Sequence, residues 1–124
     1  MPVDKQQQAR ILIVEDEPII ALTLQDLLAG AGFEIAGVAV KLETAFALIE
    51  SGRCDAAILD ANLAGVSATP LASALAERGL PFIVLSGYSP EQLQGAFPGA
   101  LFFLQKPCRP AQVIRALKTI LFKQ

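Results

Sequence analysis

Several polar side chains in this sequence stand directly after short apolar runs. The acids Glu15 and Asp16 follow ILIV, Asp60 follows AAIL, Ser86 follows FIVL, and Lys106 comes shortly after LFFL. Carboxylate oxygens are the ligands that hard divalent cations prefer, while an ammonium group and a hydroxyl can hold the oxygens of an anion. Together, these residue types would suit a site that binds a metal ion beside a negatively charged group.

Each of these residues also has an ordinary structural explanation when it is taken alone. Acids beside the start of a helix complement the helix dipole. Asp60 and Ser86 could cap a turn or a helix, and Lys106 could be a solvated charge at a sheet edge. A functional site therefore depends on whether the fold brings these side chains together.

Short apolar runs alternate with helical patterns along the chain. Such runs are typical of strands that are covered on both faces. The alternation predicts five strands and five helices, and three of the helices end at or near glycine, as helix C-termini often do. The expected strands are 11–14, 35–40, 56–59, 82–85 and 101–104, and the expected helices are 18–30, 42–52, 68–79, 89–97 and 110–122.

Strands that alternate with helices of this length form a doubly wound parallel sheet with right-handed crossovers. The predicted fold class is therefore α/β with a doubly wound sheet of five parallel strands. The flavodoxin-like (βα)5 topology expected for such a sheet has the strand order 2-1-3-4-5. In open sheets of this kind, ligands bind at the carboxyl ends of the strands. Because the polar residues stand at those ends, the acids, the hydroxyl and the lysine are expected to converge on one edge of the sheet.

Composition excludes several classes of protein. The chain has 124 residues, 53% of them hydrophobic and 18% charged, which fits one globular domain at 10–124 after a flexible lead at 1–9. A net charge of -2 and a pI near 5.0 argue against direct binding of nucleic acid or of an anionic membrane. There is no histidine, and the two cysteines have no metal-ligand spacing, which excludes histidine-dependent triads and most zinc sites. No signal peptide is recognisable, so a reducing cytoplasmic location is expected.

Four motifs together resemble the receiver domain of two-component response regulators. They are the acid pair Glu15-Asp16, LDANLAG around Asp60, LSGY with Ser86, and GALFFLQKP ending in Lys106-Pro107. The resemblance covers nearly the whole chain from Arg10 onward. It implies a signalling domain in a phosphorelay, and not an enzyme that acts on other substrates.

The resemblance also implies a role for each acidic residue. Asp60 would accept a phosphoryl group from a phosphohistidine on a sensor histidine kinase or a histidine phosphotransfer protein. Mg2+ (or Mn2+) would be bound by Asp16, Asp60 and the backbone carbonyl of Asn62, with Glu15 helping through the water shell of the metal. Magnesium keeps several waters and takes oxygen ligands, which suits such a set.

The remaining site residues would contact the phosphoryl group. Lys106 would hold one phosphoryl oxygen as a point charge, and Ser86 would donate a hydrogen bond to another. The Lys106-Pro107 peptide bond is expected to be cis. Ser86 and Phe103 occupy the positions of the family's switch residues.

Some residues depart from the usual pattern of receiver domains. Gly87 leaves space beside the phosphoryl group, whereas Tyr88 is bulky and is expected to shield it from water. The SGY sequence is similar to that of a subgroup of stand-alone receivers in alphaproteobacteria. The helix at 89–97 is expected to be short, and Leu101 and Phe102 stand where acids are often found.

An output surface is expected on the face formed by 89–97, 101–104 and 110–122. Four apolar residues in a row at 101–104 cannot share one buried face. Part of Leu101 or Phe102 is therefore exposed, where it could join a homodimer or an output partner, unless a shifted helix at 89–97 or the AFPG loop covers it. If the sequence is complete, output depends on partner binding or on onward transfer of the phosphoryl group.

Other functions make demands that this sequence does not meet. A flavin binder needs a phosphate loop where this chain has EDEP, and a dinucleotide enzyme needs GxGxxG after the first strand. A hydrolase that resembles the haloacid dehalogenase family needs a second Asp at the position of Asn62. A receiver-like interaction module that is never phosphorylated remains the alternative.

Overall fold

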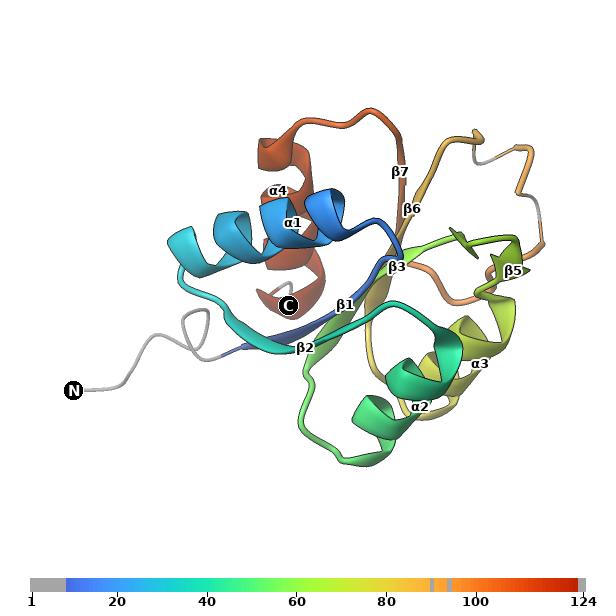
Figure 1. Ribbon diagram of the computed structural model, residues 1–124, viewed down its shortest axis with the longest axis horizontal. Helices are drawn as coiled ribbons and strands as arrows, with labels where there is room; N and C mark the ends of the chain where they lie inside the picture. Colours follow the sequence, from blue (N-terminus) through green and yellow to red (C-terminus); the bar gives the residue numbers. More distant parts are fainter. Residues whose placement is uncertain (1–8, 90, 94, 123–124) are drawn as a thin grey trace.

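The computed structural model describes residues 9–89, 91–93 and 95–122 (Figure 1). Apart from Ala9, the predicted N-terminal lead lies outside the described residues. The elements in chain order are β1 (Arg10–Val14), α1 (Pro18–Gly30), β2 (Glu34–Ala39), α2 (Leu42–Glu50), β3 (Ala56–Asp60), β4 (Asn62–Leu63), β5 (Val66–Ser67), α3 (Thr69–Glu77), β6 (Phe82–Ser86), β7 (Phe102–Gln105) and α4 (Pro110–Phe122).

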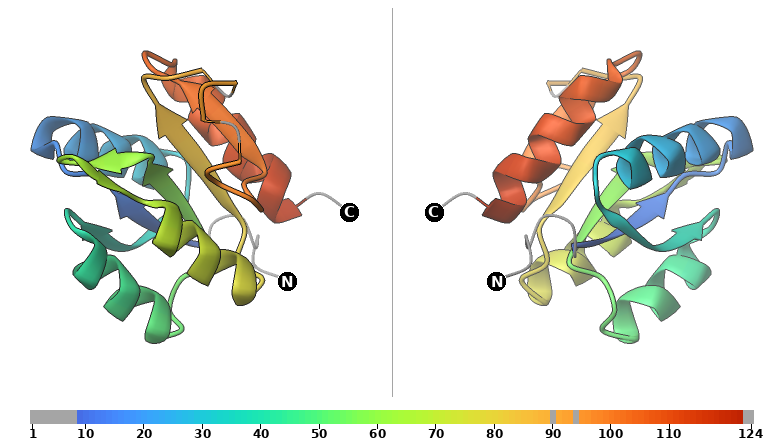
Figure 2. Two further views of the ribbon diagram at one scale, coloured as in Figure 1. Left: turned by 90° about the vertical axis from the view of Figure 1, so that its right-hand side faces the viewer. Right: turned by 90° about the vertical axis from the view of Figure 1, so that its left-hand side faces the viewer.

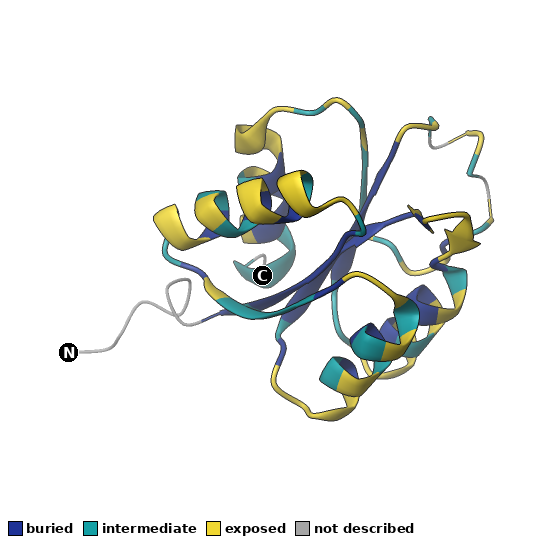
Figure 3. Ribbon diagram, viewed as in Figure 1, coloured by how far each residue is buried: buried dark blue, intermediate teal, exposed yellow. Residues whose placement is uncertain are grey.

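A five-stranded parallel sheet forms the centre of the protein. Its strand order is β2-β1-β3-β6-β7, which confirms the predicted order 2-1-3-4-5. All residues of β3 and β6 are buried, as expected for apolar strands with helices on both faces (Figure 3). β7 lies at one edge of the sheet beside β6, with α4 next to both strands (Figure 2).

Helices α1 and α4 cover one face of the sheet, and α2 and α3 cover the other (Figure 1). Alternation along β1 sends Ile11 and Ile13 into a core beneath α1 and α4, while Leu12 and Val14 enter a second core beneath α2 and α3. Burial of these two apolar layers is the main force that holds the sheet together. Across the described residues, no helix combines the length and the apolar character that a membrane span requires.

Local sequence signals place the helix ends. Pro18 stands at the start of α1, where its missing N–H is not needed. After α2 and α3 the chain turns through Gly52 (φ +74°) and Gly79 (φ +70°), a conformation that other residues rarely adopt. These glycines direct the chain into β3 and β6, so the predicted stops near them are confirmed.

The prediction of a helix at 89–97 was wrong, because the described residues of this segment form turns. Ser89 and Gln92 close a single turn, in which the Leu93 N–H donates to the Ser89 carbonyl (3.2 Å). Gly95 then adopts φ +78°, and Pro98 follows within three residues, so the helix does not continue. The described residues therefore contain four helices and not five. The short β4–β5 hairpin after Asp60 was not predicted.

The turn segment is anchored by an aromatic side chain. Phe97 is only 4% exposed and belongs to the core beneath α2 and α3. Gly99 adopts φ +93°, and a Cβ at this position would lie 3.1 Å from the Cβ of Ala76 on α3. Phe97 and Gly99 thus fix the segment against α3 and position the start of β7.

Side chains on the edge strand β7 divide between the two cores, as alternation predicted. Phe103 packs against the core beneath α2 and α3, while Phe102 and Leu104 pack against the core beneath α1 and α4. Leu101, just before the strand, is 55% exposed, which confirms the predicted apolar exposure at this edge.

We expect Phe97→Ala to lower the free energy of unfolding by about 3 kcal/mol, because it removes a buried aromatic ring and leaves a cavity. Leu101→Ala, a matched truncation of an exposed residue, should cost less than about 1 kcal/mol. Equilibrium unfolding in urea measures both values. Equal losses for the two variants would show that the segment is not anchored through Phe97.

Candidate functional site

The carboxyl edge of the sheet collects the polar residues that the sequence analysis singled out. Glu15 follows β1, Asp60 ends β3, Ser86 ends β6 and Lys106 follows β7. Parallel pairing sets Asp60 opposite Leu85, and Ser86 opposite Gln105. The ends of these strands are therefore level, and the side chains beyond them share one edge of the sheet.

Lys106 is the cation at the centre of this edge. Its Nζ lies 3.1 Å from Oδ2 of Asp60 and 3.3 Å from Oε1 of Glu15. Burial lowers the pKa of Lys106, but the charges of Asp60 and Glu15 and their hydrogen bonds outweigh this and raise it. The ammonium group is thus held in its charged form between two carboxylates.

Glu15 is the most buried acid of the site, with only 1% of its surface exposed. Burial raises the pKa of Glu15 to about 7, and the charge of Asp60 adds to this effect. The Glu17 N–H donates to Oε2 of Glu15 (3.1 Å), and this hydrogen bond and the charge of Lys106 lower the pKa of Glu15 without cancelling the effect of burial. One lysine therefore only partly offsets the charge of the acids.

A divalent cation would fit the acids at this edge. One carboxylate oxygen each from Glu15, Asp16 and Asp60 lie within 4.8 Å of one another. All three are hard oxygen donors, which suit Mg2+ and Mn2+, and the set contains no sulfur or imidazole ligand. The donor chemistry therefore fits the metal that the sequence predicts.

Asn62 lies beside Asp60 at the start of the small hairpin. Its N–H lies 3.4 Å from Oδ1 of Asp60, and its side-chain Oδ1 accepts a 2.7 Å hydrogen bond from the Gly65 N–H. The hairpin thus fixes the Asn62 side chain through the Gly65 N–H. Sequence analysis missed this hairpin, although the turn residues of ANLAGVS were a signal for it.

Ser86 lies on the other side of the site and is only 4% exposed. Its Oγ accepts a 3.0 Å hydrogen bond from the Tyr88 N–H, and its carbonyl accepts one from the Lys106 N–H (2.7 Å). The hydroxyl proton of Ser86 is left to donate to another group. The Lys106-Pro107 peptide bond is cis, as expected.

The residues next to Ser86 differ in the space around them. A Cβ at Gly87 would meet nothing within 4 Å, and Tyr88 is 60% exposed. Nε2 of Gln105 donates to the Gly87 carbonyl (3.4 Å), a contact between β7 and this loop that sequence analysis missed. Phe103 packs into the core beneath α2 and α3 and not among the charged groups.

Comparison with known proteins agrees with this fold and site. Residues 11–118 match the family described as the response regulator receiver domain. The match covers most of the chain, so the protein belongs to the receiver domains of two-component response regulators. Receiver domains are signalling domains.

Two curated relatives align with most of this chain. The phyllosphere-induced regulator PhyR of Methylorubrum extorquens is 35% identical over 117 residues, which cover 92% of this chain and 44% of PhyR. The transcriptional regulatory protein PdtaR of Mycobacterium tuberculosis is 31% identical over 112 residues, which cover 88% of this chain and 55% of PdtaR. The chain thus spans about half the length of these relatives.

Solved structures of receiver domains share the fold. The PhyR receiver domain of Erythrobacter litoralis has a TM-score of 0.85 at 27% identity, covering 98% of this chain and 95% of that one. SdrG of Sphingomonas melonis Fr1 has a TM-score of 0.78 at 40% identity, covering 93% and 98%. TrrA of Thermotoga maritima, solved in complex with Mg2+ and BeF, has a TM-score of 0.81 at 29% identity, covering 91% and 99%.

We expect the metal-free protein to lose stability as the pH rises from about 4.5 to about 7. The unfolded chain releases the Glu15 proton near 4.5, whereas the folded protein keeps it up to about 7, so the folded state binds more protons in this range. The free energy of unfolding should therefore fall by on the order of 1 kcal/mol, after allowance for solvent screening.

Glu15→Gln should remove most of this slope when unfolding in urea is measured across the pH range with a chelator present. Glu50→Gln, which changes an exposed acid on α2, should keep it. If Glu15→Gln retained the wild-type slope, Glu15 would not be the group responsible.

Proposed function

We propose that this protein is a phosphorelay receiver in which Asp60 accepts a phosphoryl group from a phosphohistidine on a sensor histidine kinase or a histidine phosphotransfer protein. The observation that carries the proposal is the contact between Lys106 and Asp60 (3.1 Å) within a cluster of three acids. A carboxylate repels an incoming phosphoryl group, so the site needs positive charge beside the nucleophile. We also propose that the protein acts in the cytoplasm and binds neither nucleic acid nor membrane directly.

In the proposed reaction, a carboxylate oxygen of Asp60 attacks phosphorus, and the bond between phosphorus and the donor imidazole nitrogen breaks. The imidazole leaves with the electron pair of that bond, and Asp60 becomes an acyl phosphate. Asp16, Asp60 and the Asn62 carbonyl would hold Mg2+ or Mn2+, and Glu15 would contact its water shell. When bound, the metal offsets the charge of the acids and of the phosphoryl oxygens.

Lys106 and Ser86 would stabilise the transferred group. Lys106 Nζ already lies beside Asp60 Oδ2, so it can move to a phosphoryl oxygen with little displacement. The Ser86 hydroxyl, fixed through its contact with the Tyr88 N–H, can donate to a second oxygen. Both contacts would stabilise the negative charge on the phosphoryl oxygens in the transition state, which is the main requirement of phosphoryl transfer. The similar receiver TrrA, which was solved with Mg2+ and BeF, supports this proposal.

The phosphohistidine donor would dock beside Lys106. An apolar groove of about 480 Å3 lies between α1 and the start of α4, and Lys106 and Pro107 line it together with Ile19 and Leu24. Ile19 is 80% exposed. Because the groove is continuous with Lys106, a protein seated in it would bring its phosphohistidine close to Asp60.

Phosphorylation would then change the surface that an output partner contacts. We propose that this surface is the face formed by β7 and α4, with Ser86 and Phe103 as switch residues. The alternative, an interaction module that is never phosphorylated, would not need Asp16, Asp60, Ser86 and Lys106 at one edge of the sheet. Their joint presence favours the phosphorylated receiver.

We expect incubation of the wild type with Mg2+ and acetyl phosphate to add the mass of one phosphoryl group, and chelation of the metal to prevent this. Asp60→Asn should abolish the mass increase, whereas Asp26→Asn, which changes an exposed acid on α1, should leave it intact. Intact-mass spectrometry measures the labelled fraction. Full labelling of Asp60→Asn, or labelling that is unaffected by chelator, would refute the proposal.

We propose that Tyr88 shields the phosphoryl group from water in the phosphorylated protein, so Tyr88→Ala is expected to speed the loss of this group. The decay of the labelled mass after removal of acetyl phosphate gives the rate. Leu22→Ala serves as a control, because it truncates an exposed side chain on α1 that lies outside the acid cluster. Equal decay for wild type and Tyr88→Ala would assign Tyr88 no shielding role.

A further inference from the structure

Charge is distributed unevenly along this chain. All 12 acids lie at or before Glu91, whereas five of the 10 basic residues lie after it. The protein is acidic as a whole, with a net charge of -2, yet the part of the chain that forms β7 and α4 contains no acid. These late basic residues are Lys106, Arg109, Arg115, Lys118 and Lys123.

A groove between β7 and α4 combines this positive charge with apolar surface. It has a volume of about 560 Å3, and its apolar lining includes Phe102, Leu104 and Ala116. Arg109 and Arg115 stand at its rim, and both are exposed. No acidic side chain lines the groove, and no ion pair found among the described residues involves either arginine.

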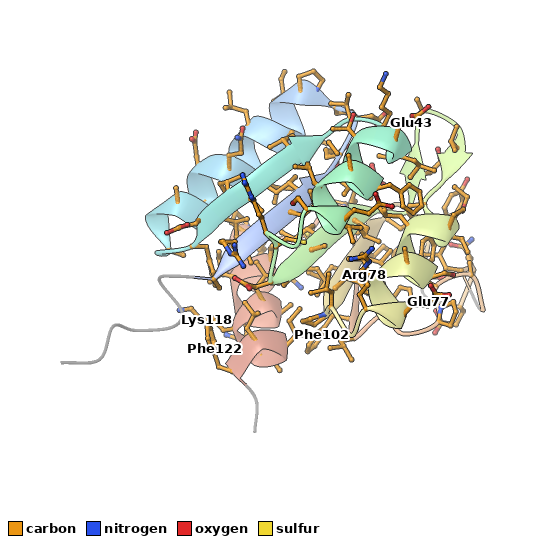
Figure 4. The ribbon with its side chains drawn as sticks, turned by 90° about the horizontal axis from the view of Figure 1, so that it is seen from below. Glu43, Glu77, Arg78, Phe102, Lys118 and Phe122 are labelled. Carbon is orange, nitrogen blue, oxygen red and sulfur yellow. The ribbon has the colours of Figure 1, made fainter. Side chains whose placement is uncertain are left out.

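Positive charge continues across the exposed side of α4. A second groove of about 760 Å3, between α1 and α4, is lined by Arg115, Lys118 and Phe122. Seen from below, Phe102 lies on one side of α4, and Lys118 and Phe122 lie on the other (Figure 4). Arg115 borders both grooves, so the exposed side of α4 is basic between two apolar flanks.

A second copy of this chain does not complement the groove. In a twofold dimer the same patch faces itself, so a dimer through β7 and α4 would bring the arginines of one copy toward those of the other. No acid on either element would offset the repulsion. The apolar lining also distinguishes the groove from a surface for nucleic acid, whose contacts are mainly to phosphates.

We propose that the groove between β7 and α4 binds an acidic, amphipathic segment of a partner protein. Apolar side chains of the segment would cover Phe102 and Leu104, while its carboxylates would pair with Arg109 and Arg115. The inference rests on the proposed function, because it gives the chemistry of the partner to which the receiver passes its signal. The protein's other acids would disfavour such a partner elsewhere on its surface.

The test is a selection from a phage-displayed library of random peptides on the full chain, with and without Mg2+ and acetyl phosphate. Peptides enriched on the wild type should combine Asp and Glu with large apolar residues. Synthesised and measured in solution, they should bind Arg115→Glu roughly tenfold or more weakly than wild type and lose affinity with added salt. Phe102→Asp should weaken the same peptides, with thermal unfolding checking that the variant folds.

Arg53→Glu is the matched control, since it makes the same charge change at an exposed site outside α4 and should bind the peptides as wild type does. Enriched peptides without an acidic excess, or equal binding to Arg115→Glu, would overturn the inference. The inference would also be overturned if sedimentation showed that the wild type forms a dimer which Arg115→Glu dissociates. It would equally be overturned if no peptide were enriched and the wild type, but not Arg115→Glu, bound phosphatidylglycerol vesicles or duplex DNA.

Labelling of Asp60 separates this inference from the proposed function. Arg115→Glu should be phosphorylated by acetyl phosphate to the same extent as wild type, because Arg115 is not part of the acid cluster. Normal labelling without acidic peptide binding would overturn only the inference. Absence of labelling in the wild type would overturn the proposed function.

Discussion

Repulsion among Glu15, Asp16 and Asp60 is the constraint on which the site depends. Their carboxylate oxygens lie within 4.8 Å of one another, and Glu15 is almost fully buried. Like charges this close raise the pKa of one member or attract a cation. Lys106, which follows the edge strand β7, supplies one positive charge, and this leaves the acids only partly neutralised. The same deficit that destabilises the metal-free site would favour a divalent cation there, as the proposed phosphoryl transfer requires.

The two apolar cores make this repulsion tolerable. Strands β1, β3 and β6 are buried along most of their length, so the sheet gains enough from apolar burial to hold polar groups at its carboxyl edge. Lys106 follows β7, the strand with a neighbour on one side only. Its position therefore depends on pairing with β6 and on the turn segment that Phe97 and Gly99 fix against α3.

Sequence patterns predicted the parts of this protein that follow from periodicity. Apolar runs and helix-ending glycines predicted the five strands of the sheet and four of the five expected helices, because burial on both faces and positive φ leave clear signatures. The strand order was predicted from the topology expected of such a sheet. SPEQLQGAF was predicted as a helix from its place in the alternation of strands and helices. Gly95 instead adopts positive φ, and Phe97 enters a core built by distant residues, so the described residues of this segment form turns. The bridge from Lys106 to both carboxylates also depends on tertiary placement, which spacing alone does not give.

Lys106 connects the acidic site to the basic surface of α4, so a change in the contacts of Lys106 can be transmitted to that surface. Only three residues separate Lys106 from the start of α4, and Arg109 is the last of them. If Lys106 exchanges a carboxylate for a phosphoryl oxygen, the chain that carries it can displace Arg109 and the rim of the β7–α4 groove. A partner that binds one arrangement of this rim better than the other shifts the same equilibrium. By linkage, such a partner would also stabilise phosphorylated Asp60, so signal output and phosphoryl lifetime would be coupled by one free energy.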